Sequence, residues 1–336
     1  MPGPERRTPK VAAVIVSWNV KDYLRDCLRA LYEWTGDIAL EVHVVDNGSS
    51  DGTAAMVRES FPKVRLIPGE KNVGFAAANN IALAEILKDK SAGYILLINA
   101  DIEVGEGTVE GLVEELVRTP EAGAAAPALI LADGRFQAGA AGFLPSLASG
   151  LEYFLFFGRL SPFGSGSLFI NQARFARREE SVRVEWLSGA CLMLKREAIE
   201  AAGLLDEEYF FCLEDIDLGK RLGEKNFELL YIPRLKVLHH HGISYKTVLR
   251  EINTEWLRLL FAYVRREKGR GAADVFRAAA VLGFFLRLLG RSVLALAGGS
   301  PDRGRRLKEA AAFFSFSLTG RGRHAINAEE DSSCRF

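Results

Sequence analysis

Short apolar runs alternate with amphipathic stretches through the first two thirds of the chain. Apolar runs rich in β-branched residues, separated by segments of helical spacing, are the pattern of βαβ units on a largely parallel sheet. The runs predict strands at 11–16, 40–45, 64–67, 94–98 and 228–232. Helices are predicted at 23–34, 53–60 and 196–202, with a loop leading into a helix at 72–88 and another helix from 214. The expected fold class is therefore α/β.

Polar residues follow several predicted strands where each one ends. Ligands of open α/β sheets bind beyond the carboxyl ends of the strands, so these residues are candidates for a site. Asp46 can accept a hydrogen bond from a base or ribose, but an Asx-turn that caps the next helix has the same pattern. Asn99 and Asp101 face the same side of an extended chain and suit Mg²⁺ or Mn²⁺ held with a diphosphate. A plain strand-terminal turn is the alternative.

A second acidic cluster, Glu214, Asp215 and Asp217, opens the predicted helix at 214. Carboxylates in a first helical turn usually only stabilise the helix dipole. Here Phe210 and Phe211 precede them, and partial desolvation beside like charge raises a carboxyl pKa toward general-base duty. The cluster is therefore a candidate for proton transfer.

Three of the five histidines, His239, His240 and His241, follow a predicted strand. A single histidine there would be an ordinary polar residue. Three in succession indicate that at least one contacts a metal ion or a phosphate.

Composition narrows the class of protein. With 49% hydrophobic and 26% charged residues, the chain is neither disordered, collagen-like nor a disulfide scaffold. The four cysteines have no CxxC spacing, and the N-terminus is too quickly polar for a signal peptide, so a cytosolic protein is expected. The motifs GxGxxG, GxxxxGK[ST], GxSxG and HExxH are absent, which disfavours Rossmann dehydrogenases, P-loop ATPases, serine hydrolases and zinc proteases.

Charge is unevenly distributed along the chain. The totals balance at 43 Lys and Arg against 43 Asp and Glu, which argues against a nucleic-acid partner. Residues 246–323 nevertheless hold sixteen basic and six acidic residues. Arg277, Arg287 and Arg291 share one helical arc in this region, and the opposite face carries Val281, Leu282, Phe285, Leu289 and Val293. The pattern predicts an interfacial helix on an anionic membrane, while packing on the folded domain with solvated arginines is the alternative.

Six ordered motifs carry a family resemblance. They are VSWN (16–19), VVDNGSSDGT (44–53), KNVGFAAANN (71–80), INAD (98–101), WLSGACLMLKR (186–196) and FFCLEDIDLGKR (210–221), followed by a histidine with Gly-x-Ser. Over residues 10–270 the chain resembles a family 2 glycosyltransferase of the GT-A fold, a Rossmann-like, mostly parallel sheet flanked by helices. More narrowly it is similar to the bacterial rhamnosyltransferase-like branch that builds cell-wall polysaccharide, O-antigen and lipid-linked saccharides.

The resemblance implies roles for individual residues. Asp101 would hold the Mn²⁺ or Mg²⁺ ion, with Asn99 in place of the first acid of the family's DxD motif, and His239, or else His241, would contact the metal or the diphosphate. Asp215 would be the general base, supported by Glu214. The nucleotide and donor would contact Val16, Ser17, Trp18, Asn19, Asp46, Lys71, Asn72, Asn99, Ala100 and Asp101, and the acceptor or sugar pocket would include Trp186, Ser188 and Gly189.

The implied reaction is an inverting transfer of a sugar from a dTDP- or UDP-linked donor, with dTDP-rhamnose the best expectation, to a lipid-linked saccharide or polysaccharide. A nucleotidyltransferase and a membrane-associated nucleotide-sugar-binding protein without turnover are the alternatives. The expected organisation is a disordered segment at 1–10, a GT-A domain at 11–270 with an irregular insertion at 133–183, a basic amphipathic helical membrane-associating region at 271–325 and a tail at 326–336. A cytoplasmic protein, peripheral on the inner face of the cell membrane, is expected, and a homodimer is left open.

Overall fold

The computed structural model describes residues 9–155, 168–170, 172–175, 178–240, 254–296 and 301–320. The chain forms two compact units, one of Met1–Leu144 with Phe169–Ile243 and one of Pro145–Leu168 with Ser244–Phe336. The predicted boundary at 270 therefore differs from the observed one at 243. It falls inside helix α10 (Glu255–Leu296), whose two halves pack in the same unit. Residue 10 opens a strand rather than ending a disordered segment, and the predicted tail at 326–336 lies outside the described residues.

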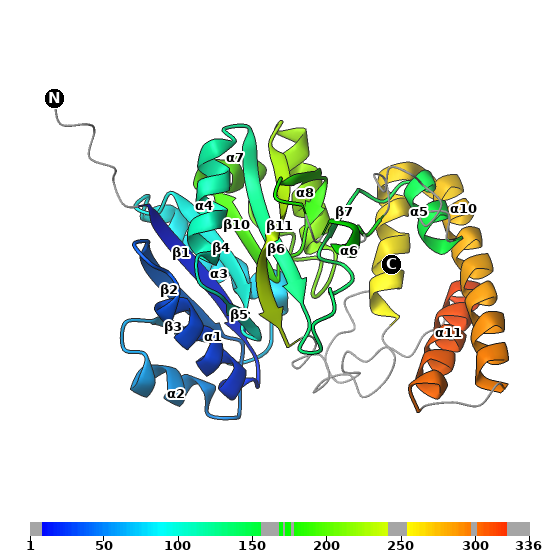
Figure 1. Ribbon diagram of the computed structural model, residues 1–336, viewed down its shortest axis with the longest axis horizontal. Helices are drawn as coiled ribbons and strands as arrows, with labels where there is room; N and C mark the ends of the chain where they lie inside the picture. The colour runs from blue at the N-terminus through cyan, green and yellow to red at the C-terminus, as the bar shows by residue number, and fades with distance from the viewer. Residues whose placement is uncertain are drawn as a thin grey trace. The chain divides into compact units, whose positions relative to one another are not determined.

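The first unit is built on a nine-stranded sheet with the order β3-β2-β1-β4-β10-β6-β11-β5, in which β8 also pairs with β11 (Figure 1). Its strands are β1 (Lys10–Ser17), β2 (Ala39–Asp46), β3 (Arg65–Pro68), β4 (Tyr94–Asn99), β5 (Ile102–Val104), β6 (Ala122–Ile130), β8 (Val182–Val184), β10 (Cys191–Lys195) and β11 (Glu228–His239). β10 runs antiparallel between β4 and β6, and β5 and β8 run antiparallel to β11. The remaining pairs are parallel, which confirms the predicted class.

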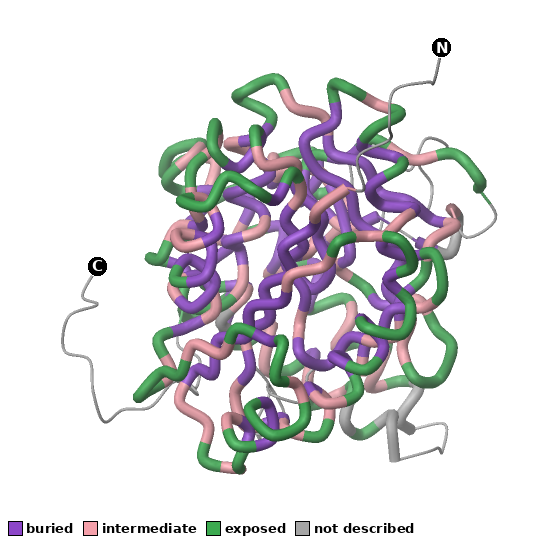
Figure 2. Tube along the Cα trace, turned by 90° about the vertical axis from the view of Figure 1, so that its left-hand side faces the viewer, coloured by how far each residue is buried: buried purple, intermediate pink, exposed green. Residues whose placement is uncertain are grey.

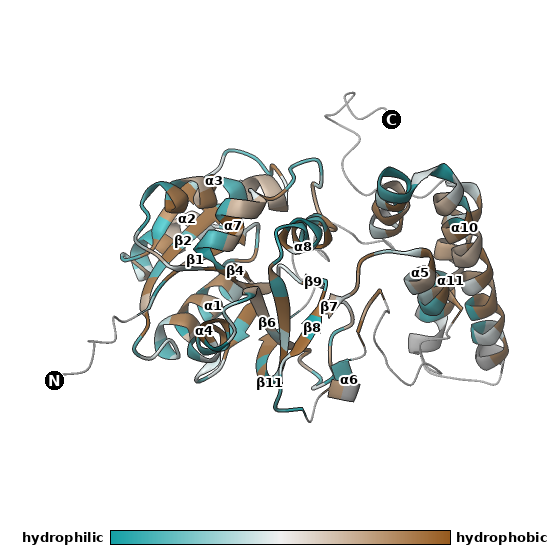
Figure 3. Ribbon diagram, turned by 90° about the horizontal axis from the view of Figure 1, so that it is seen from above, coloured by the Kyte–Doolittle hydropathy of each residue, from teal (hydrophilic) through white to brown (hydrophobic). Residues whose placement is uncertain are grey.

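Helices cover both faces of this sheet. They are α1 (Lys21–Glu33), α2 (Thr53–Ser60), α3 (Phe75–Lys88), α4 (Thr108–Arg118), α7 (Arg196–Ala202), α8 (Glu214–Glu224) and the short α6 (Gln172–Phe175). Alternate residues of β1 point to opposite faces, so Val11 and Ile15 join a core with α1, α2 and α4, whereas Ala12 and Val14 join one with α3, α7 and α8. Figure 3 shows α1 and α4 on one side of the sheet and α3 and α7 on the other. The strands between them are buried (Figure 2).

Most predicted elements are present, with one difference that matters for the site. The helices at 53–60 and 196–202 are confirmed, the second ending at Gly203 with φ +84°. The strand predicted at 228–232 continues to His239 across a register shift between Ile232 and Lys236. Pro233 lies in that shift, where the missing N–H is tolerated. The longer strand carries His239 to the edge of the sheet where β4 ends.

The predicted irregular insertion at 133–183 was wrong in part, because its described residues include regular elements. β7 (Ala141–Gly142) pairs with β9 (Trp186–Leu187), and α5 (Leu147–Phe154) begins with a capping box between Ser146 and Ser149. α5 belongs to the second unit, where the Phe154 ring packs 5.4 Å from that of Phe276. Sequence spacing did not reveal a helix whose packing partner lies over a hundred residues further along the chain.

The second unit consists of α5, α10 and α11 (Pro301–Thr319). α10 is kinked at Gly269, where φ is +84°. No helix among the described residues is both long and apolar enough to cross a membrane. The exposed face of α10 carries large apolar residues, Val275, Leu282, Phe285, Leu286, Leu289 and Val293.

The arginines of α10 bind carbonyl groups of the protein, whereas the predicted interfacial helix would direct them toward lipid phosphates. Arg287 donates hydrogen bonds to the carbonyl oxygens of Tyr153 and Phe154 at 2.8 and 3.0 Å. Arg277 donates to two carbonyl oxygens near the end of α11 at 2.6 and 3.1 Å, and Arg291 donates to the carbonyl oxygen of Arg306. Carbonyl groups at helix C-termini lack partners within the helix, so the guanidinium groups of Arg277 and Arg287 satisfy them.

Candidate active site

The first two motif loops are bound to each other at the carboxyl edge of the sheet. Asn19, with φ +54°, accepts a hydrogen bond on its side-chain oxygen from the N–H of Ser50 at 2.8 Å. Its own N–H donates to Ser49 Oγ at 3.0 Å, and the N–H of Lys21 donates to Asp51 at 2.9 Å. The second motif therefore fixes the loop that follows the residues expected to bind the nucleotide sugar, Val16, Ser17, Trp18 and Asn19.

Asp46 ends β2 and is buried beside the end of β1, where Ser17 is its register partner. Its Oδ1 atom accepts a hydrogen bond from the N–H of Ser49 at 3.0 Å. Asp46 thus stabilises the turn that follows β2, but it does not cap α2, as the alternative interpretation required. The first N–H of α2, from Thr53, donates instead to Asp51 Oδ1 at 3.1 Å. Contact of Asp46 with a base stays a prediction.

Asn47, which the sequence analysis did not name as a site residue, connects the second motif to the third. Its Nδ2 atom donates to Asn72 Oδ1, and its Oδ1 atom accepts from the N–H of Val73, both at 2.9 Å. Asn72 is therefore partly buried in the loop, whereas Lys71 is exposed. The one available signal was its position directly after the strand-terminal Asp46.

Gly74 joins the third motif to the acidic segment. Its φ is +92°, and a Cβ atom there would lie 2.7 Å from the carbonyl oxygen of Phe210, so only glycine fits without displacement. The same carbonyl oxygen accepts a hydrogen bond from the N–H of Phe75 at 2.8 Å. The nucleotide loop and the loop that leads to Asp215 are thus in direct contact.

Asp101 and His239 meet at the end of the sheet. Asp101 lies in the turn between β4 and β5, and His239, the last residue of β11, is the register partner of Ile102. Their side chains are buried, with His239 Nε2 at 3.1 Å from Asp101 Oδ1. The N–H of His240 donates to the carbonyl oxygen of Asp101 at 3.0 Å, which fixes the two segments together.

The neighbouring histidines separate into different environments. His240 Nε2 lies 2.5 Å from Glu103 Oε1, and its ring packs 5.1 Å from that of Tyr23. His241 lies outside the described residues. Of the two described histidines of the triplet, His239 is thus the one that faces Asp101.

Asp101 and His239 form a donor set that fits a divalent cation. No group of three or more His, Cys, Asp and Glu side chains with metal-site geometry occurs among the described residues, so this site offers a carboxylate and an imidazole. Mg²⁺ and Mn²⁺ commonly take one or two protein ligands and complete their shell with phosphate oxygens and water. The pair is therefore suited to a cation shared with a diphosphate.

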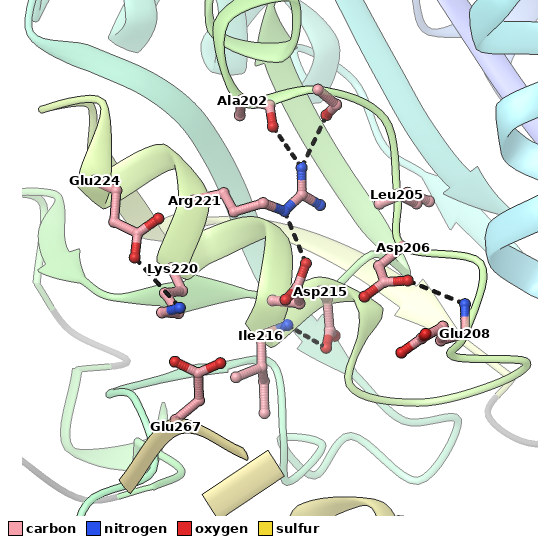
Figure 4. A network of polar contacts seen from close by, with 12 residues as sticks. Ala202, Leu205, Asp206, Glu208, Asp215, Ile216, Lys220, Arg221, Glu224 and Glu267 are labelled. Atoms are coloured by element: carbon pink, nitrogen blue, oxygen red, sulfur yellow. Dashed lines mark hydrogen bonds and ion pairs between the residues drawn. The ribbon is translucent and has the colours of Figure 1, made fainter.

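Asp215 lies in the first turn of α8 and is partly buried. Burial raises its pKa to about 6, although hydrogen bonds from the N–H groups of Ile216, at 2.8 Å, and Gly189 act in the opposite direction (Figure 4). Glu214 is buried, and its Oε2 atom has no hydrogen-bond partner among the described residues. Burial, and then the charge of Asp215, raises the Glu214 pKa well above its ordinary value. A carboxylate that titrates just below neutral pH is suited to accept a proton.

The acidic segment is held in a strained conformation. Cys212 and Leu213 have φ of +70° and +72°, a region that side chains other than glycine rarely adopt. Asp217, the third acid, pairs with Arg221 at 2.8 Å, and Arg221 also donates to the carbonyl oxygen of Ala202 at 2.6 Å (Figure 4). Asp217 therefore anchors α8, and only Glu214 and Asp215 remain for chemistry.

The segment from Trp186 to Gly189 lies between the acidic residues of α8 and the turn that carries Asp101. A Cβ atom on Gly219 would lie 2.5 Å from the carbonyl oxygen of Glu185, so α8 packs tightly on this segment. Gly189 lies beside the Asp215 carboxyl and lowers its pKa, and the carbonyl oxygen of Ala190 accepts from the N–H of Asn99 at 2.9 Å.

The other predicted site residues of this segment and of the Asp101 turn are buried or partly buried. Trp186 is buried against Phe169, with ring centroids 5.7 Å apart, and Ser188 is partly buried next to Gly189. Ala100, between Asn99 and Asp101, is also buried. The predicted metal turn and base are thus linked through two adjacent residues.

Comparison with known proteins shows the family of the chain. The sequence model of glycosyl transferase family 2 matches residues 12–179. An N-acetylglucosaminyl-diphospho-decaprenol L-rhamnosyltransferase of Mycobacterium tuberculosis is 33% identical over 247 residues, covering 70% of this chain and 78% of that protein.

Two solved structures are similar in fold. The mannosyltransferase PcManGT from Pyrobaculum calidifontis in complex with GDP-Man and Mn²⁺ has a TM-score of 0.56 at 17% identity, covering 93% of this chain and 87% of that one. GalNAc-T7 with UDP, GalNAc and Mn²⁺ has a TM-score of 0.55 at 16% identity, covering 80% of this chain and 52% of that one. At these identities the likeness concerns the fold, and it confirms the expected GT-A architecture. With the family match and the 33% identical relative, this chain belongs to glycosyl transferase family 2.

Proposed function

We propose that this glycosyltransferase transfers L-rhamnose from dTDP-rhamnose to a hydroxyl group of a lipid-linked saccharide or polysaccharide, with inversion at the anomeric carbon. The observation that carries the proposal is the position of Asp215 next to the segment that holds the Asp101 turn: Gly189 lies beside the Asp215 carboxyl and lowers its pKa, and Ala190 accepts a hydrogen bond from the N–H of Asn99 at 2.9 Å. The mycobacterial relative, a rhamnosyltransferase by name with an N-acetylglucosaminyl-diphospho-decaprenol acceptor, supports the choice of sugar and acceptor class.

In this proposal Asp215 takes the proton of the acceptor hydroxyl as its oxygen bonds to the anomeric carbon. The bond between that carbon and the diphosphate oxygen breaks on the opposite face, and the nucleoside diphosphate leaves with the bonding electrons. Asp101 and His239 would hold Mn²⁺ or Mg²⁺, which supplies charge neutralisation for the departing diphosphate. Glu214, buried next to Asp215 in the first turn of α8, would orient it.

The binding surface for the nucleotide sugar would be formed by the first three motif loops, which hydrogen bonds join to one another. Asn19, Asp46 and Asn72 lie on loops that hydrogen bonds connect, so a pyrimidine nucleotide would meet a preformed surface. Trp186, Ser188 and Gly189 would line the sugar or acceptor side, next to Asp215.

A location on the inner face of the cell membrane belongs to the same proposal. Its support is the lipid-linked acceptor of the relative and the exposed apolar residues of α10. In flotation with anionic vesicles, full-length protein is expected to bind, and Leu286→Glu with Leu289→Glu is expected to release it. Equal partitioning of the two would refute the membrane contact.

The reaction is tested by incubating the protein with dTDP-rhamnose, UDP-sugars and GDP-mannose, with Mn²⁺ or Mg²⁺, and a polyprenyl-diphosphate saccharide. Release of nucleoside diphosphate that needs both dTDP-rhamnose and acceptor is expected. Preference for another nucleotide sugar would refute the assignment of rhamnose, whereas the assignment as a glycosyltransferase would stand. Tight binding of a nucleotide sugar without any release would instead favour the non-catalytic alternative.

A further inference from the structure

The second ring nitrogen of His239 faces a side chain outside every family motif. His239 Nδ1 lies 2.6 Å from Oε1 of Gln137, and both side chains are buried. The other nitrogen, Nε2, lies on the Asp101 side at 3.1 Å from Oδ1. The imidazole ring is therefore held between an amide and a carboxylate.

Gln137 is itself fixed in position. Its N–H donates to the carbonyl oxygen of Leu129 at 2.9 Å, and its carbonyl oxygen accepts from Nε2 of Gln172. The Oε1 atom of Gln172 accepts from the buried hydroxyl of Tyr231 at 2.8 Å. Gln137 is thus anchored to β6 and, through Gln172, to β11, the strand that carries His239.

The chemistry of the contact determines the protonation of the ring. An amide oxygen only accepts hydrogen bonds, so His239 Nδ1 carries the hydrogen when it bonds to Gln137. In the neutral ring this leaves a lone pair on Nε2, the atom beside Asp101, and a lone pair is what a cation requires. Outer partners of this kind orient metal-binding histidines and set their tautomer.

We propose that Gln137 is a positioning residue of the cation site, which fixes the Nδ1–H tautomer of His239 and directs Nε2 toward Asp101. The inference rests on the cation site of the proposed function and adds a residue to it. A Gln137 that only filled a polar gap would affect stability, whereas a positioning residue also affects the ring tautomer and the affinity for the metal.

The test compares Gln137→Leu, which removes the acceptor, with Gln137→Glu, which keeps an acceptor oxygen. Thr35→Val is the control, because Thr35 is also buried and hydrogen-bonded, to the carbonyl oxygen of Leu31. Mn²⁺ affinity is measured by electron paramagnetic resonance without nucleotide. With only five histidines in the chain, ¹⁵N-imidazole labelling reports the tautomer, and His239→Ala assigns the signal.

We expect Gln137→Leu to weaken Mn²⁺ binding by about 10- to 100-fold and to change the His239 tautomer pattern. The Mn²⁺ affinities of Gln137→Glu and Thr35→Val should remain within about threefold of the wild-type value, which is small beside the loss expected for Gln137→Leu. Wild-type binding that Gln137→Leu leaves within about twofold, or a wild-type His239 without Nδ1–H, would overturn the role of Gln137 alone. A wild-type protein that binds no Mn²⁺ would overturn the cation site and this inference with it.

Discussion

Replacing Asp215 by asparagine should make the protein more stable while removing its activity. Burial shifts the Asp215 pKa from 3.8 to about 6 in the folded state. Each pKa unit corresponds to about 1.4 kcal/mol, so ionised Asp215 costs the fold about 3 kcal/mol. Relief of the repulsion on Glu214 acts in the same direction. For a unit of this size, the melting temperature should rise on the order of 5–10 °C.

The pH dependence distinguishes this cause from others. Below about pH 3 the carboxyl is largely protonated in both states, so the wild type carries little penalty. Between pH 4 and 6 the unfolded state ionises first, and wild-type stability falls as the pH rises. The advantage of Asp215→Asn should therefore grow over this range and stay constant above it.

Thermal unfolding from pH 4.5 to 8, followed in parallel with nucleoside diphosphate release, checks the prediction. Release should fall by about 10²- to 10⁴-fold, as expected for loss of a general base. Asp217→Asn is the matched control in the same helical turn, and it should destabilise by roughly 1–3 kcal/mol, because it breaks the bond to Arg221. An Asp215→Asn protein that melts at or below the wild type at every pH would refute the reasoning from burial. Unchanged turnover would remove Asp215 as the base.

Three further outcomes follow from the contacts. Gly74→Ala should lower stability by about 1–3 kcal/mol and raise the KM for the donor, since its Cβ would lie 2.7 Å from the Phe210 carbonyl oxygen; unfolding and initial rates measure both. Asp101→Asn should raise the Mn²⁺ concentration needed for half-maximal rate by about tenfold or more, whereas His240→Asn, which loses the Glu103 and Tyr23 contacts, should not; a metal titration that shifts both variants equally would contradict the assignment. Arg287→Ala should destabilise the second unit by about 1–3 kcal/mol, because two carbonyl oxygens lose their donor, and limited proteolysis should detect it.

The sequence predicted the edge of the sheet where the site lies because the signals there are local. A strand that stops at Asp46 or Asn99 and then turns polar can be recognised within a few residues, and the family motifs begin at the same positions. The acidic cluster that contains the candidate base Asp215 was also recognisable, since acids beside Phe210 and Phe211 are unusual at a helix start, and the family resemblance singled out Asp215 within it.

Other parts of the site depend on contacts between distant segments, which spacing does not encode. Gln137 lies in a glycine- and alanine-rich stretch and meets His239 only because β11 continues past its register shift. Likewise, the helical arc of Arg277 and Arg287 was correctly located, but nothing local shows that helix ends, rather than lipid or water, receive their hydrogen bonds. The antiparallel β10 between two parallel strands was missed for the same reason.

The bonds from Asn19 to Ser50, from Asn47 to Asn72 and from Phe75 to Phe210 join the first motif loop to the second, the second to the third and the third to the sixth. For protein engineering, this means that a loop grafted alone from a relative with another donor would arrive without its partners. Exchange of sugar specificity should therefore succeed with whole sets of loops transplanted together, and single-loop chimeras should fold poorly or lose turnover before they change substrate.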